Sequence, residues 1–91
     1  MSYKVHWSEK ALNDLAAIWI NADAATRVAI NRATTSIDKL LLTTPDQVGE
    51  SRDGNQRVFF LSPLIFSFAV YEMERAVLIL GVRPVKYRKS N

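Results

Sequence analysis

The apolar residues of this chain follow two different repeats, and the change between them near Pro45 is the strongest constraint on the fold. Between residues 9 and 43, apolar positions recur every three or four residues, which is the spacing of amphipathic helices. After Pro45 they alternate or run continuously in short segments, which is typical of strands. An all-helical fold and an all-strand fold are therefore both excluded, and we expect an α+β fold.

The first residues predict a short strand that leads into a helix. Aromatic and apolar residues alternate with polar ones in this segment, at Tyr3, Val5 and Trp7. Ser8 is a good N-cap, and the helix that follows is expected to end near Asn21. Its apolar positions have the spacing of one buried face, and they are Leu12, Leu15, Ala16 and Trp19. We expect both tryptophans to lie in the core.

A second helix is predicted to begin after Asp23, which can cap it. Its expected inner face is the apolar stripe formed by Ile30, Ala33, Ile37, Leu40 and Leu41. Only a few residues separate the two helices, so we expect them to form an antiparallel hairpin.

The second half of the chain predicts three strands joined by short turns. Asp53-Gly54-Asn55 is a strong turn signal, and strands are expected at residues 58–61, 65–71 and 77–82. The last of these is almost entirely apolar, which suits a central position. We therefore expect an antiparallel β-sheet, made of the N-terminal strand and a three-stranded C-terminal meander, with the two-helix hairpin packed on one face. A single domain should span residues 1–91.

Several classes of chemistry lack the residues they need. The chain has no cysteine and one histidine, His6, so we expect no metal site and no cofactor. The N-terminus does not have the pattern of a signal peptide, and no apolar run is long enough to cross a membrane. A cytoplasmic protein that does not contact a membrane is the expectation.

Basic residues are the remaining candidates for a functional site. The net charge is +3, and the whole excess lies after residue 46. Arg83, Lys86, Arg88 and Lys89 follow the last predicted strand without an acidic residue among them. Such a tail favours a polyanion such as RNA as a partner, although a solvated tail that aids solubility has the same composition.

Two further arginines, Arg52 and Arg57, flank the predicted turn at Asp53. In an antiparallel meander, Arg57 and Arg83 are expected at the same edge of the sheet, where guanidinium groups could hold phosphates. The alternative is that Arg52 and Arg57 form surface ion pairs with Glu50 and Asp53.

The order of these motifs resembles the RelE/ParE superfamily of bacterial toxins over nearly the whole chain. The resemblance begins at Tyr3-Lys4-Val5-His6-Trp7-Ser8 and continues through Ala11, Leu12, Asp14 and Leu15. It resumes at Gly49-Glu50-Ser51-Arg52, at Arg57-Val58, at Pro63-Leu64, at Phe68-Ala69-Val70-Tyr71 and at the segment from Val77 to Val82. The resemblance implies a RelE/ParE-like fold and the toxin of a type II toxin-antitoxin module, which forms a hetero-oligomer with its cognate antitoxin.

The resemblance to RelE-like members implies an mRNA interferase, an endoribonuclease that cleaves mRNA on the ribosome. Arg57, Arg83 and Tyr87 fall at or near positions that are catalytic in those members. The basic residues around them are then expected to bind nucleic acid, and these are Arg52, Lys86, Arg88 and Lys89.

The sequence also departs from the RelE-like pattern. Phe59 stands at a second basic position of that pattern, and residues 65–67 lack the arginine expected on the next strand. This departure suits ParE-like members, which inhibit DNA gyrase without nuclease activity. An inactive module that keeps only antitoxin binding would have the same sequence features.

Overall fold

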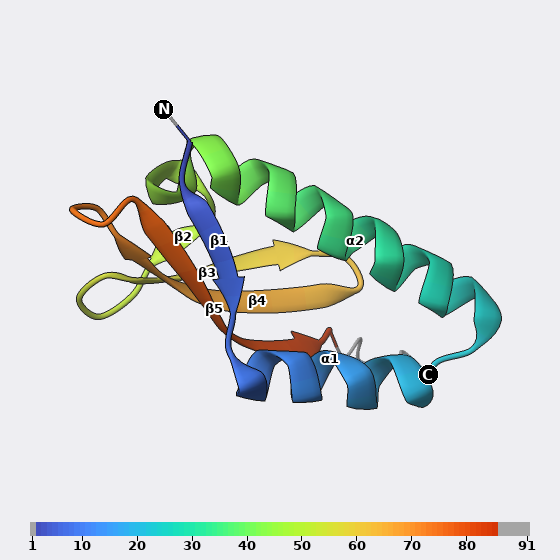
Figure 1. Cartoon of the computed structure of the whole chain (residues 1–91). Coiled ribbons are helices and arrows are strands. Elements are labelled where there is room, and N and C mark those ends of the chain that lie inside the picture. The colour runs from blue at the N-terminus through green and yellow to red at the C-terminus, as the bar shows by residue number, and fades with distance from the viewer. Residues whose placement is uncertain (1, 86–91) are drawn as a thin grey trace, which may run out of the picture.

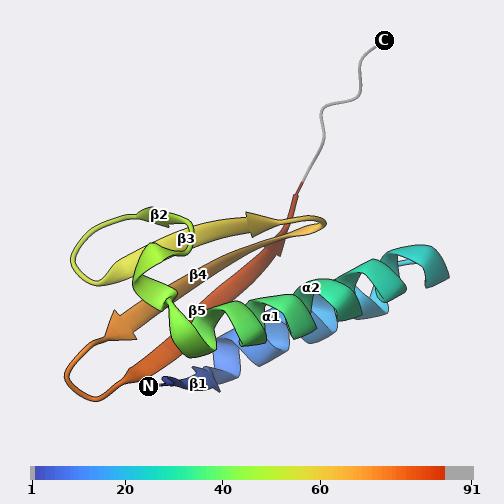
Figure 2. The same ribbon diagram turned by 90° about the horizontal axis from the view of Figure 1, so that it is seen from above.

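The computed structural model describes residues 2–85 and has two layers, with two helices on one side of a five-stranded sheet (Figure 1 and Figure 2). The elements follow in the order β1 (Lys4–Trp7), α1 (Glu9–Ile20), α2 (Ala24–Thr43), the short 3-10 helix η1 (Pro45–Gln47), β2 (Glu50–Ser51), β3 (Gln56–Leu61), β4 (Leu64–Tyr71) and β5 (Ala76–Pro84). The predicted α+β architecture is confirmed.

The sheet has the strand order β1-β5-β4-β3-β2. Strands β2 to β5 pair in antiparallel fashion, as the meander predicted. The strand expected to be central, β5, lies inside the sheet between β1 and β4, and the central strand is β4. Two details differ from the prediction. The N-terminal strand β1 runs parallel to β5, and β2 is an additional edge strand of only two residues. The parallel pairing continues into the next residue, because the Ser8 amide donates to the Ile79 carbonyl oxygen at 3.0 Å.

Both predicted N-caps are confirmed. The Ser8 hydroxyl oxygen accepts from the Ala11 amide at 3.0 Å, and the Asp23 carboxylate accepts from the Thr26 amide at 2.8 Å. The hydrogen bonds from Thr26 hold the pKa of Asp23 below its ordinary value. These caps satisfy amides that have no partner within the helix, and they fix where α1 and α2 begin.

The core lies between α2 and the inner face of the sheet. Four residues of the predicted stripe on α2 are buried, namely Ile30, Ala33, Ile37 and Leu41. They pack over inward-facing residues of β4 and β5, which include Phe66, Phe68, Val77 and Ile79. Trp7 lies edge-on to Phe66, with ring centroids 6.1 Å apart, and its indole nitrogen donates to Asp38 of α2 at 3.1 Å.

The inner face of α1 differs from the prediction. Ala11 is buried, and Leu15 and Ile18 pack against the core, whereas Leu12 is 52% exposed and Trp19 39% exposed. The pattern failed because the true inner face includes the charged residue Asp14, so the most apolar stripe was not the buried one.

Trp19 therefore lies at the surface and not in the predicted core position. The guanidinium group of Arg27 lies 4.2 Å from the centre of the Trp19 ring. On α2, the predicted core residue Leu40 is likewise 39% exposed. These two corrections concern the edges of the apolar stripes, where periodicity alone defines burial poorly.

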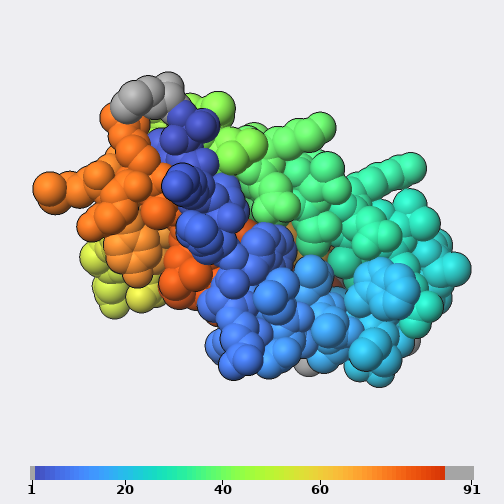
Figure 3. Space-filling view, viewed as in Figure 1, coloured from blue at the N-terminus to red at the C-terminus, as the bar shows by residue number. Residues whose placement is uncertain are grey.

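The helices and β1 cover the side of the molecule seen in Figure 3, where α1 is blue and α2 runs from cyan to green. Within residues 2–85, no helix is long and apolar enough to cross a membrane.

Candidate functional site

The face of the sheet that points away from α2 is partly open within residues 2–85, and side chains of α1 reach only its β5 end. Register places Val58 of β3, Ser67 of β4 and Gly81 of β5 side by side on this face. One pair further along lie Phe60, Ile65 and Arg83. Phe60 is 52% exposed, and Arg83 is also exposed. The open face therefore combines apolar side chains with a cation.

Arg83 points outward because β5 contains a bulge. The pairing of β4 with β5 shifts between Ser67 and Phe68, which pair with Gly81 and Ile79. The intervening residue of β5, Leu80, is thus extra and reverses the alternation of the strand. Without it, Arg83 would have the same orientation as Ile79 and would face the core.

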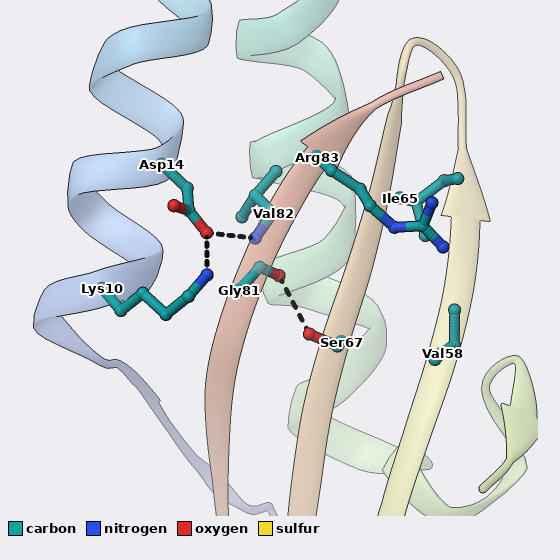
Figure 4. A pocket seen from close by; sticks show the side chains of 8 residues that line it. All are labelled: Lys10, Asp14, Val58, Ile65, Ser67, Gly81, Val82 and Arg83. Carbon is teal, nitrogen blue, oxygen red and sulfur yellow. Dashed lines mark hydrogen bonds and ion pairs between the residues drawn. The ribbon is translucent and has the colours of Figure 1, made fainter. Parts of the chain in front are cut away.

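Among the described residues, the Arg83 side chain has no hydrogen-bond or ion-pair partner, and it extends across β4 toward β3 (Figure 4). It borders two hollows on the open face, which share Val58, Ile65 and Arg83. We call these two hollows together the outer groove. An unpaired guanidinium in a groove can form two parallel hydrogen bonds to a phosphate or carboxylate.

The first hollow has a volume of about 170 Å³ and lies over β3, β4 and β5, with α1 along one side. Lys10 and Asp14 of α1 reach over its wall, and the Lys10 ammonium donates to the Asp14 carboxylate at 2.7 Å (Figure 4). The same carboxylate oxygen accepts from the Val82 amide at 3.1 Å. The bond from Lys10, followed by that from Val82, holds the pKa of Asp14 below its ordinary value. Asp14 thereby gives the Val82 amide a hydrogen-bond acceptor at the edge of β5, beyond the end of β1.

The second hollow has a volume of about 390 Å³ and lies over β3, toward β2. Arg52 and Glu50 border it, with 3.3 Å between a guanidinium nitrogen and a carboxylate oxygen. Both side chains are more than half exposed, so this ion pair contributes little to stability. The outer groove thus has an arginine at its β2 end, Arg83 near its middle and a lysine at its α1 end.

The predicted site residues are only partly brought together. Arg52 and Arg83 border the same hollow, whereas Arg57 lies on the opposite side of the sheet. Its guanidinium donates to the carbonyl oxygens of Val48 at 2.8 Å and Gly49 at 3.0 Å. The expected meeting of Arg57 and Arg83 is therefore wrong. Arg57 anchors the segment before β2, and a catalytic role for it stays a prediction.

Four of the predicted residues lie outside the described residues, namely Lys86, Tyr87, Arg88 and Lys89. Within residues 2–85, no three acidic or histidine side chains are grouped as metal ligands would be.

The sequence reasoning missed Lys10, Asp14, Ser67 and Gly81 as residues of this groove. One signal was visible: Lys10 and Asp14 are four residues apart on a predicted helix, the spacing of an ion pair on one face. That spacing does not show that the pair lies over a glycine 67 residues further along the chain. Only the packing of α1 beside β5 brings them together.

Comparison with solved structures shows that this chain has the fold of RelE and ParE toxins. It superimposes on a chain of the chromosomal ParDE toxin-antitoxin system from P. aeruginosa with a TM-score of 0.72 and 21% identity, covering 92% of this chain and 97% of that one.

Two RelE structures are also similar. For the RelBE2 toxin-antitoxin complex from Mycobacterium tuberculosis, the TM-score is 0.66 and the identity 16%, over 93% of this chain and 100% of that one. For the isolated E. coli RelE toxin, the TM-score is 0.61 and the identity 13%, over 96% and 88% of the two chains. No protein-family model and no curated protein matches the sequence.

Proposed function

We propose that this chain is the toxin of a type II toxin-antitoxin module and that it cleaves mRNA on the ribosome. The observation that carries the proposal is the unpaired Arg83, which lies exposed in the outer groove on the open face of a RelE/ParE-like fold. Its guanidinium would contact the phosphate at the cleaved bond.

In this cleavage the ribose 2′-oxygen attacks the phosphorus and the bond from phosphorus to the 5′-oxygen breaks, while the 2′-hydroxyl proton is lost to solvent and the 5′-oxygen takes up a proton. Negative charge builds up on the phosphate during the step and has to be stabilised. A guanidinium is suited to this, because it donates two parallel hydrogen bonds and keeps its charge at any physiological pH. We assign this role to Arg83, and the resemblance implies that Tyr87 acts beside it. Arg52, at the β2 end of the groove, would hold the backbone of the same strand.

The proposed antitoxin partner would cover exposed apolar side chains of the helices. Ile20 is 66% exposed, Leu12 52% and Val28 50%. Apolar side chains at this exposure often mark a protein interface, and an antitoxin segment that folds on binding could bury them. The toxin would then be a hetero-oligomer with its antitoxin.

Inhibition of DNA gyrase is the second candidate, and the apolar floor of the outer groove favours it. Val58 and Ile65 line the hollow beside Arg83, at positions where cationic side chains would help a nuclease to bind RNA. The similarity to the ParDE structure fits this candidate as well.

The test is inducible expression of the intact chain in bacteria, beside Arg83→Ala, Tyr87→Ala and Lys39→Ala. Lys39 is the matched control, because it is an exposed cation on α2, which packs on the other face of the sheet. Growth, mRNA integrity and plasmid supercoiling are followed in the same cultures. The proposal expects growth arrest with cut transcripts, relieved by the first two substitutions and unchanged by the third.

Two results would contradict this proposal. Growth arrest with intact mRNA and relaxed plasmids would support gyrase inhibition instead. Unimpaired growth, with the protein present in the cells, would identify an inactive module.

A further inference from the structure

The α1 end of the outer groove has a second cation, in the hollow that Arg83 also borders. Lys10 and Arg83 both border the 170 Å³ hollow, and Asp14 is the acidic residue that borders it. The formal charge of the three side chains is therefore +1. The volume compares with roughly 30 Å³ for one water molecule in the liquid, so a phosphate group and bridging waters fit.

Gly81 lies at the α1 side of this hollow. A Cβ at this position would lie 3.2 Å from the Lys10 ammonium nitrogen, 3.3 Å from an Asp14 carboxylate oxygen and 3.3 Å from the Ser67 hydroxyl oxygen. Three polar groups, two from α1 and one from β4, thus converge beside β5 at a point where residue 81 has no Cβ. We call this point the notch: its ammonium and hydroxyl can donate to an anion, whereas the Asp14 carboxylate opposes one.

The Ser67 hydroxyl is weakly engaged. It donates to the Gly81 carbonyl oxygen at 3.4 Å, which is long for a hydroxyl donor, whose usual distance is about 2.7–2.8 Å. Rotation about its Cβ–Oγ bond would redirect the proton into the notch at small cost. Lys10 is also available, because its side chain is 73% exposed and an ammonium has three protons to donate.

We propose that Lys10, Ser67 and the notch at Gly81 form a phosphate-binding subsite for the backbone of a single-stranded RNA, next to the phosphate that Arg83 holds. The subsite rests on the proposed function, since it binds a neighbouring phosphate of the same strand. Asp14 positions Lys10 over β5 and at the same time lowers the affinity of the notch for an anion.

The experiment is binding of a short, fluorescently labelled oligouridylate to the full chain, measured by anisotropy over a range of potassium chloride concentrations. Lys10→Ala is expected to weaken binding about tenfold at low salt and to reduce the salt slope by about 0.7, the change for one lost contact to a single strand. Gly81→Ala is expected to weaken binding without changing the net charge, because the methyl group presses on the Lys10 ammonium and the Ser67 hydroxyl and displaces them.

Asp14→Asn gives the sharpest test, because it is expected to strengthen binding. The amide oxygen can still accept from the Val82 amide, while the negative charge beside the notch is removed. Lys39→Ala is the control for loss of one positive charge elsewhere, and a thermal melt of each variant checks the fold.

The outcomes separate the two proposals. If Arg83→Ala abolishes binding while Lys10→Ala behaves as Lys39→Ala does, the subsite is refuted and the proposed function stands. If neither Arg83→Ala nor Lys10→Ala changes binding, the outer groove is not the RNA surface and both fail. Binding of a polyglutamate peptide that depends on Lys10, with no binding of RNA, would assign the notch to a protein partner and overturn the subsite.

Discussion

Two glycines with left-handed backbone angles provide a matched test of how tightly β2 is held to β3. Gly49 has φ +72° and Gly54 has φ +61°. A Cβ at Gly49 would lie 2.2 Å from the Val58 carbonyl oxygen, whereas a Cβ at Gly54 would meet nothing within 4 Å. Substitution by alanine therefore places the same strain on the backbone at both positions, but creates a steric clash at only one.

The difference in free energy of unfolding can be estimated. An alanine in the left-handed region costs about 1 kcal/mol, which is the whole effect expected for Gly54→Ala. Gly49→Ala must also move its segment away from β3, which breaks the short β2 ladder and the hydrogen bonds from Arg57. The two bonds from Arg57, at about 1 kcal/mol each, bring the expected loss to at least about 3 kcal/mol.

Urea unfolding followed by far-ultraviolet circular dichroism measures both values on the purified chain. The expected result is a loss at least 2 kcal/mol larger for Gly49→Ala than for Gly54→Ala. Equal losses would refute the reasoning, because they would mean that the segment before β2 moves aside freely. Arg52 would then be held only loosely at its end of the outer groove.

Three further predictions concern single side chains. Arg57→Lys should lower the free energy of unfolding by about 1–2 kcal/mol, because lysine cannot reach both carbonyl oxygens of the segment before β2, and an unchanged urea midpoint would contradict this. The hydrogen bonds that lower the pKa of Asp14 stabilise the fold above pH 3.8, and this stabilisation is lost as the pH falls through the folded-state pKa. Asp14→Asn should therefore lose less stability than the wild type in an acid titration, and equal losses would contradict this. The hydrogen bond to Glu72 raises the pKa of Tyr3 above 10.0, so stability should fall as the pH rises past 10.0, and Tyr3→Phe should remove that fall in alkaline melts. An identical alkaline profile for the two chains would count against the bond.

Much of the fold could be predicted because it depends on neighbours within one or two turns. Ser8 and Asp23 cap the helices as their side-chain chemistry indicates, and the turn at Gly54 lies where the sequence predicted it. The strand expected at residues 65–71 is β4, and two of its alternating residues, Phe66 and Phe68, are buried. Each of these features is local, so the printed residues contain the necessary information.

The site was less predictable because it depends on pairing between distant segments. The sequence identified Arg52 and Arg83, and both border the outer groove. It also grouped Arg57 with them, although Arg57 lies on the opposite side of the sheet. It did not indicate Lys10, because a lysine on a helix shows nothing about the strand beside which that helix packs.

By itself, the sequence determined the order of the elements, their caps and the basic character of the C-terminal half. The tertiary structure decided which side chains share the open face. One extra residue in β5, Leu80, reverses the alternation of the strand and turns Arg83 from the core side to the outer groove. A bulge arises from the pairing of two strands, and this pairing balances contacts across the whole sheet. The local pattern of apolar residues is the same with the bulge or without it, so only the folded sheet specifies where Arg83 points.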